Sequence, residues 1–288
     1  MTGPETPARI VWLASYPKSG NTWLRAFLAN YIENRESPIP INELGRFAPH
    51  EATRAPYDAL AKQSGKELDD GEVYRLRPQV QRMTNRRAQT FVFMKTHAAL
   101  VQVNGVRTIA PEVTAGAIYV VRNPLDVAVS FASHMGCGLD EAIAALTNEA
   151  TELPIVQNLV HEHLGSWSGH VRSWLETPGL SPHLIRYEDL SRDPEGVFGK
   201  LVEFLRLPPE PGRLRRAIAF ASFKELAGQE SSGGFKEKPS SPDRFFRSGK
   251  AGSWRDALSE SQAERIVADH GQVMRRLGYL DSGGALVF

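Results

Sequence analysis

A short polar segment near the start of the chain, residues 15–22, carries residue types that bind anions. An apolar run at 10–13 precedes it and apolar residues at helical spacing follow it, so the pattern predicts a strand, a tight turn and a helix. The first N–H groups of a helix have no partner within it. Together with the helix dipole and a lysine ammonium they favour a phosphate or sulfate. The alternative is an ordinary turn with a solvated lysine. The residues of the predicted anion loop are Lys18, Ser19, Gly20, Asn21 and Thr22.

The residue order in this turn argues against a nucleoside triphosphate loop. Neither G-x-x-x-x-G-K-[ST] nor a G-x-G-x-x-G after a predicted strand occurs in the chain. Lys18 instead precedes its glycine, and Tyr-Pro-Lys-Ser-Gly-Asn-Thr-Trp at 16–23 resembles the 5′-phosphosulfate loop of sulfotransferases that use 3′-phosphoadenosine 5′-phosphosulfate, PAPS. The resemblance is to the cytosolic type, and we expect a bacterial member. It implies that the loop binds the phosphosulfate and that Trp23 packs on the adenine. The alternative for Trp23 is a place in the helix core.

A second predicted strand, residues 90–94, ends beside a lysine and a histidine. Ligands of open parallel α/β sheets bind outside the carboxyl ends of the strands, so Lys95 and His97 are placed for chemistry. A lone histidine, however, is more often structural or solvated. Lys-Thr-His at 95–97 is similar to the family's K-T-H element. The resemblance implies that His97 deprotonates the acceptor and that Lys95 steadies the sulfuryl oxygens.

A third predicted strand, 117–121, is nearly uninterrupted in its apolar residues and is expected at the centre of the sheet. Pro124 then suits the first turn of a helix. The segment VVRNPLDVAVSF resembles the family's 3′-phosphate motif, which implies that Arg122 and Ser130 bind the phosphate on the ribose. A guanidinium offers phosphate a planar set of donors, and a hydroxyl adds a directed hydrogen bond. The alternative is a surface arginine and a serine embedded in a helix.

Two weaker elements lie between the main motifs. Tyr187 ends the fourth predicted strand, 183–187, and Tyr-Glu-Asp at that place resembles a family element whose tyrosine contacts adenosine. Ala-Ser-Phe at 221–223 resembles the segment that packs on the adenine, which implies that Phe223 is the stacking ring.

The segment RFFRSGKAGSWR at 244–255 resembles the family's R-K-G-x-x-G-x-W-K motif. The resemblance implies that Arg247, Ser248 and Gly249 contact the cofactor. Glycines permit close backbone approach to a phosphate, and Arg247 brings charge. Ser248 stands where the family usually has lysine, which puts the affinity for the 3′-phosphate in doubt unless Lys250 compensates.

These elements predict one α/β domain over 1–288, in which a P-loop-like central parallel sheet is flanked by helices. We expect a flexible tail at 1–8 and a mobile loop at 229–243, which is rich in Ser, Gly and Pro. Helical insertions at 35–90 and 134–170, with that loop, are expected to build the acceptor pocket. A capping box at 261–264 predicts the last helix, ending near Gly278. The other expected helices are 57–67, 74–87, 139–150, 159–175, 194–206 and 214–221.

The amino-acid composition limits which partners, cofactors and cellular locations are expected. The net charge of +1 gives no overall basic field, so neither nucleic acid nor an anionic membrane is expected as a partner. One cysteine, Cys137, excludes an intramolecular disulfide framework, and nothing in the sequence proposes a metal site. No apolar window suggests secretion or membrane insertion, so we expect a cytoplasmic protein. The dimerisation signature that some family members carry after the Trp motif is absent, which leaves the oligomeric state open.

The three main motifs in family order predict sulfuryl transfer from PAPS to a hydroxyl of a small-molecule acceptor, with 3′-phosphoadenosine 5′-phosphate, PAP, as product. PAPS has an anionic group at each end, and the chain offers an anion site for each. Two alternatives stay open at this point. One is a protein that binds PAP or a sulfated ligand without turnover, and the other is a phosphoryl transferase of the kinase type.

Overall fold

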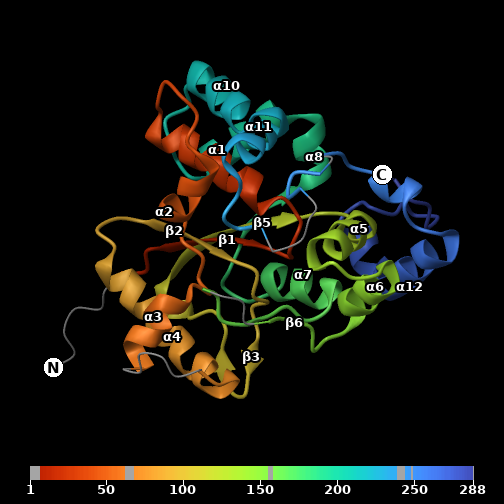
Figure 1. The fold of residues 1–288 in the computed structure, drawn as a ribbon, viewed down its shortest axis with the longest axis horizontal. Helices are drawn as coiled ribbons and strands as arrows, with labels where there is room; N and C mark the ends of the chain where they lie inside the picture. Colours follow the sequence, from red (N-terminus) through yellow and green to blue (C-terminus); the bar gives the residue numbers. More distant parts are fainter. Residues whose placement is uncertain (1–6, 62–67, 155–157, 239–243, 248, 288) are drawn as a thin grey trace.

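A parallel four-stranded sheet forms the centre of the computed structural model, which describes residues 7–61, 68–154, 158–238, 244–247 and 249–287. The strand order is β2-β1-β5-β8, with bounds β1 Ile10–Ser15, β2 Val92–Thr96, β5 Thr114–Val121 and β8 His183–Arg186 (Figure 1). Ala14 of β1 pairs with Thr96 of β2 and with Tyr119 of β5. The carboxyl ends of these three strands therefore meet at one edge of the sheet. The predicted parallel α/β sheet and its four strands are confirmed.

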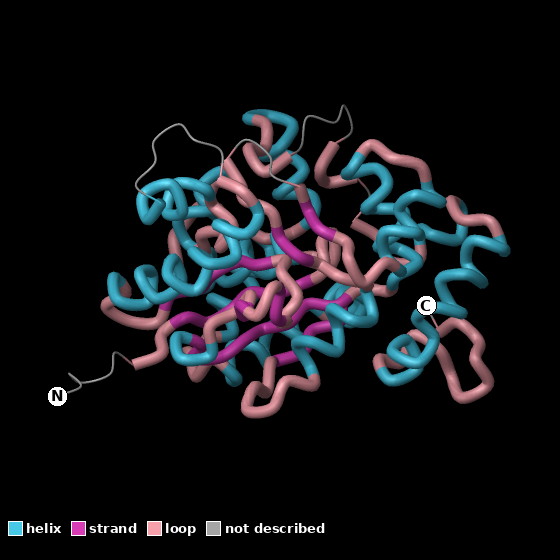
Figure 2. The backbone as a smooth tube through the Cα atoms, turned by 90° about the horizontal axis from the view of Figure 1, so that it is seen from below, coloured by secondary structure: helices cyan, strands magenta, loops and turns pink. Residues whose placement is uncertain are grey.

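Alternating residues of the central strands supply two apolar cores, one on each face of the sheet. Trp12 and Tyr119 point into the first and Leu13 and Val120 into the second, and all four are fully buried. The first core is covered by α5 Pro124–Met135, α6 Leu139–Thr147, α7 Trp167–Leu175 and α12 Glu260–Arg276. The second is covered by α1 Asn21–Glu33, α9 Pro194–Phe204, α10 Pro211–Phe220 and α11 Phe223–Gly233. Figure 2 shows the strands lying between these helices.

The expected helical insertion between β1 and β2 is also present. Asp69 caps α4 Asp70–Arg87 by accepting from the Glu72 N–H, and the Glu72 side chain returns the contact. Tyr57, Val73 and Val160 form a separate small core there. The remaining short elements are η1 Ile41–Glu43, α2 Leu44–Phe47, α3 Arg54–Ala61, β3 Gln102–Val103, β4 Val106–Arg107, η2 Pro111–Val113, β6 Glu152–Leu153, β7 Glu162–His163, α8 Tyr187–Arg192 and η3 Ser253–Asp256.

Besides shifts of a few residues at several helix and strand ends, three sequence-based predictions of element bounds are wrong. The helix expected over 159–175 begins only at Trp167, because β7 pairs with β6 and Ser166 then caps α7 by accepting from the Gly169 N–H. Residues 229–233 are the last turn of α11 rather than part of a loop. The last helix is capped by Ser259 with Gln262, two residues before the expected capping box. Most of the expected tail, residues 1–6, part of the expected loop, 239–243, part of the expected helix 57–67, and Ser248 lie outside the described residues.

Within the described ranges, no helix has the length and apolar character needed to cross a bilayer. The same ranges hold no group of three or more side chains suited to bind a metal ion.

Candidate active site

The loop between β1 and α1 has the backbone of an anion cradle. Lys18 (φ 67°) and Gly20 (φ 109°) both take left-handed conformations, which a lysine adopts at a cost of about 1–3 kcal/mol. A Cβ at residue 20 would lie 2.8 Å from Cδ2 of Tyr187, so only glycine fits. The Asn21 amide donates to the Leu13 carbonyl at 2.8 Å and fixes the turn. No side chain caps the start of α1, which leaves its first N–H groups directed at the loop.

Two buried polar atoms support a bound anion at this place. The Ser19 hydroxyl and Nε of Arg122 have no hydrogen-bond partner among the described residues. Buried polar atoms without a partner are rare, and a missing ligand is one of the usual reasons. Ser19 in the loop and Thr22 in the first turn of α1 are both buried. The donor set therefore fits a phosphate or sulfate.

Among the described residues, no carboxylate forms an ion pair with the Lys18 ammonium. Its Nζ lies 3.5 Å from Nδ1 of His134 and 3.8 Å from the centre of the Phe245 ring. Burial, followed by the charges of Arg122 and Lys95, lowers the pKa of Lys18 to about 7. Lys18, Arg122 and Lys95 repel one another in the free protein, and a bound anion would relieve this repulsion.

His97 is set up as a proton acceptor at the end of β2. Its Nδ1 donates to the Ser15 carbonyl at 2.8 Å, because a carbonyl can only accept, and this leaves the lone pair on Nε2. Burial, together with the nearby Lys95 charge, holds the pKa of His97 well below its usual range. The imidazole is therefore neutral at pH 7, as a general base requires.

Lys95 is buried and belongs to a charge cluster that sequence reasoning missed. Its Nζ donates to Glu237 Oε2 at 3.0 Å, and the same carboxylate receives two hydrogen bonds from Arg25, of 2.8 and 2.7 Å. Burial lowers the pKa of Lys95, and Glu237 opposes that change. Burial also opposes the ionisation of Glu237, yet Lys95 and Arg25 hold its pKa well below its usual range. In the sequence, the position of Arg25 among the apolar residues of α1 was the signal for a buried ion pair.

Arg122 connects the second predicted anion site to the first. Its guanidinium donates to the carbonyls of Lys250 (2.9 Å) and Lys18 (3.4 Å) and lies 4.4 Å from the centre of the Tyr187 ring. Ser130 is half-buried on α5, and its hydroxyl makes none of the hydrogen bonds found among the described residues. Arg122, Tyr187 and Lys18 are thus brought together, whereas no hydrogen bond within the described residues joins Ser130 to them.

Asp126 anchors the C-terminal motif to this site and was not singled out from the sequence. This buried carboxylate accepts from the Gly252 N–H (2.7 Å), the Ser253 hydroxyl (3.0 Å) and the Trp254 N–H (3.1 Å). It also lies 3.8 Å from Arg122. An acidic residue inside an otherwise apolar helical segment was its signal in the sequence.

Aromatic rings line the region expected for the adenine. Trp23 meets Tyr187 edge-on at 5.7 Å, and Phe223 is 38% exposed. A Cβ at Gly249 would lie 2.3 Å from the Phe223 ring, so a glycine is required there. Arg247 is exposed. Its charge also lowers the pKa of Lys18, but less than burial, Arg122 and Lys95 do. Lys250 contacts Arg122 through its carbonyl, so compensation for Ser248 by its ammonium stays a prediction.

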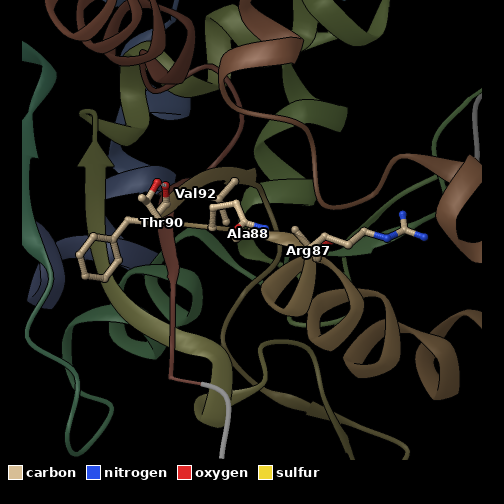
Figure 3. Close-up of a pocket in the computed structure, with 7 residues that line it drawn as sticks. Arg87, Ala88, Thr90 and Val92 are labelled. Carbon is tan, nitrogen blue, oxygen red and sulfur yellow. Dashed lines mark hydrogen bonds between the residues drawn. The ribbon is translucent and has the colours of Figure 1, made fainter.

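An open pocket lies at the opposite end of β2. Figure 3 shows Arg87, Ala88, Thr90 and Val92 around it, at the amino end of the strand rather than beside His97. None of the predicted site residues line this pocket.

Comparison with known proteins identifies the family of the chain and similar folds. Sulfotransferase 2A1 of Rattus norvegicus is 26% identical over 258 residues, which cover 88% of this chain and 80% of that protein. Flavonol 3-sulfotransferase of Flaveria bidentis is 25% identical over 273 residues, covering 89% and 78%. Retinol dehydratase in complex with retinol and PAP has a similar fold, with a TM-score of 0.63, 18% identity, and coverage of 94% of this chain and 83% of that one. Mouse sulfotransferase SULT7A1 complexed with PAP gives a TM-score of 0.58 at 19% identity, with 96% and 86% covered. The family described as "Sulfotransferase domain" matches residues 9–278, and the chain belongs to that family.

Proposed function

We propose that this protein transfers the sulfuryl group of PAPS to a hydroxyl of a small molecule, with His97 as general base and Lys18 as the main cation at the leaving group. One observation carries this assignment. A neutral histidine with a free Nε2 ends β2, and an uncapped helix start with Lys18 follows β1, its neighbour in the sheet. Base and anion cradle therefore lie at the same edge of the sheet.

The chemical step follows from these placements. His97 Nε2 takes the proton of the acceptor hydroxyl, whose oxygen forms a bond to sulfur. The bond between sulfur and the bridging phosphate oxygen breaks, and its electron pair stays on PAP. Lys18 and the N–H groups of the loop stabilise that charge, and Lys95 steadies the sulfuryl oxygens. Arg122 and Ser130 bind the 3′-phosphate, with Arg247, Ser248 and Gly249 from the C-terminal motif. Trp23, Tyr187 and Phe223 hold the adenosine.

The acceptor is proposed only by class. Relatives named for flavonols, and a retinol dehydratase bound to retinol, support a small molecule that carries a hydroxyl. A relative named cytosolic sulfotransferase 14, from Arabidopsis thaliana and 29% identical over 267 residues, supports action in the cytoplasm.

Incubation with PAPS labelled in its sulfuryl group and a panel of phenols, sugars, lipids and secondary metabolites tests the reaction. We expect label to pass to at least one hydroxyl acceptor. Calorimetry tests the cofactor, since the proposal requires binding of PAP in preference to ATP. Tight PAP binding without transfer to any acceptor would favour a binding protein, and preference for ATP would favour a kinase.

Arg122→Ala is expected to raise the KM for PAPS while leaving kcat largely intact. Hydrogen bonds to charged groups contribute about 1.5–3 kcal/mol, which corresponds to about 10- to 150-fold in KM. Within the described ranges, Arg122 makes no hydrogen bond to His97 or Lys95, so the chemical step keeps its base. Initial rates against PAPS concentration measure both constants. Arg82→Ala is the control, because Arg82 pairs with Glu112 far from this loop. A fall in kcat at unchanged KM would contradict the assignment.

Binding of PAP is expected to weaken as pH rises above 7. In the free protein the pKa of Lys18 is about 7, and a bound phosphate raises it. Below pH 7 Lys18 is protonated in both states, whereas above it each binding event must take up a proton, so Kd rises by up to about tenfold per pH unit. Calorimetry from pH 6 to 9 measures this slope. In Lys18→Arg the guanidinium stays charged, so the slope should vanish while the titration of PAP itself is unchanged. Equal slopes in the two proteins would refute the role of Lys18.

A further inference from the structure

A buried carboxylate lies behind the proposed base and belongs to none of the motifs. Glu162 is 1% exposed, its Oε1 accepts the His97 backbone N–H at 2.8 Å, and its Oε2 lies 2.9 Å from Nε2 of His50. Burial opposes its ionisation, but His50 and His97 hold the pKa of Glu162 well below its usual range. A full negative charge therefore sits beside His97.

The fold brings this carboxylate to the base by two backbone contacts. The segment 49–51 makes two hydrogen bonds with Lys95, of 2.8 and 2.9 Å, and so extends the sheet beyond β2. On the other side, the Ala99 N–H donates to the His163 carbonyl at 2.8 Å, which holds β7 against the segment that follows β2. Glu162 is thereby placed between His50 and His97. The two imidazole rings meet edge-on at 5.7 Å.

We propose that Glu162 is a positioning residue for His97, fixed in turn by His50, and this inference rests on the proposed function because it assigns a partner to the base. When the acceptor O–H bond breaks and the Nε2–H bond forms, His97 becomes an imidazolium. The Ser15 carbonyl already holds Nδ1–H, and Glu162 supplies the charge that stabilises the imidazolium. After PAP and the sulfated acceptor leave, the proton passes to water.

Several charged or polar groups face His97 from the elements packed around it, so the effect of Glu162 must be separated from theirs. Lys95 and His50 oppose protonation of His97, whereas Glu162 and the Ser15 carbonyl favour it. His170 donates from Nε2 to the His97 carbonyl at 2.9 Å and holds the backbone. Among these groups, Glu162 is the carboxylate that contacts the residue directly.

The test replaces the charge and keeps the shape. Glu162→Gln should lower kcat by about 10- to 100-fold, a part of the 10²–10⁴-fold that a general base contributes, with PAP affinity within threefold of wild type. The loss should be smaller for 4-nitrophenol than for phenol, or for another such pair from the active acceptor class, because a more acidic hydroxyl needs less help from the base. His163→Gln is the control. It removes the His163–Glu152 contact, made on the face of the β7 strand opposite to that of Glu162, and should leave both constants unchanged.

Equal losses for the two acceptors, or a wild-type kcat, would overturn the proposal. Glu162→Asp keeps the charge and should retain more turnover than Glu162→Gln. If Glu162→Gln does not fold, His50→Gln tests the proposal instead. Its kcat should fall several-fold at unchanged PAP affinity, and a wild-type kcat would reject the proposed roles of Glu162 and His50. If no acceptor is turned over by the wild type, the proposed function has failed instead. The pKa of His97, measured by NMR, then still tests the coupling and must be lower in Glu162→Gln.

Discussion

Replacement of His97 by alanine is expected to reduce kcat by about 10²–10⁴-fold, the usual contribution of a general base. The expectation rests on protonation state and geometry together. Nδ1 is committed to the Ser15 carbonyl, and burial keeps the imidazole neutral, so Nε2 is available to take the acceptor proton. The two nearest charged groups do not take over as base, because Lys95 is a cation held by Glu237 and the Glu162 carboxylate is bound to the backbone N–H of residue 97 and to His50.

The measurement is sulfuryl transfer at saturating PAPS, with PAP binding by calorimetry as the test of folding. PAP affinity should stay near the wild-type value, since in the part of the chain that the structure describes neither residues 18–22 nor Arg122 form a hydrogen bond with the imidazole. His183→Ala serves as a matched control, because His183 lies at the start of β8, at the end of the sheet away from His97. A fully active His97→Ala enzyme would remove the base assignment.

Local patterns were sufficient for the sheet and the motif loops. Continuous apolar runs identify β1, β2 and β5, and the prolines at 124 and 194 occupy the first turns of α5 and α9 as expected. The loop residues Lys18 and Gly20 follow from the same local signal. These features are decided within about ten residues, where hydrophobic period and turn chemistry act directly.

The charge clusters around the site could not be predicted from the sequence, because they join residues that are far apart in the chain. Arg25 meets Glu237 across 212 positions, Glu162 meets His97 across 65, and Asp126 meets Trp254 across 128. Each pair depends on the packing of elements that are distant in the chain, and no local pattern links one partner to the other. A charged residue within an apolar stretch signals a buried partner but does not identify it.

The α7 region shows how a short tertiary pairing overrides helical spacing. Residues 159–166 carry apolar and polar residues compatible with a helix, yet β7 forms there because it pairs with β6 and with the segment after β2. That change of structure is what directs Glu162 toward His97. The sequence-based error in secondary structure and the missed positioning residue thus have one cause.

Replacement of Lys18 by alanine is expected to reduce kcat by about 10²–10³-fold. A preorganised donor at a developing oxyanion is worth about 3–4 kcal/mol, and Lys18 is the ammonium in the loop where the leaving phosphate is proposed to bind. Its left-handed backbone adds a complication, because alanine at φ 67° keeps the strain that lysine carries but loses the side-chain contacts with His134 and Phe245 that help to hold the loop. Activity loss in Lys18→Ala alone would therefore mix chemistry with loop distortion.

Lys18→Gly separates the two effects. Glycine adopts this φ without strain, so the variant should be at least as stable as Lys18→Ala in thermal unfolding while losing the same turnover. The pH dependence of stability provides a second readout. The pKa of Lys18 is about 7 in the folded chain and near 10.5 unfolded, so the unfolded state binds more protons between these values and wild-type stability gains with rising pH there. That contribution should be absent from both variants. Recovery of turnover in Lys18→Gly would mean that loop strain, and not the ammonium, accounts for the loss in Lys18→Ala.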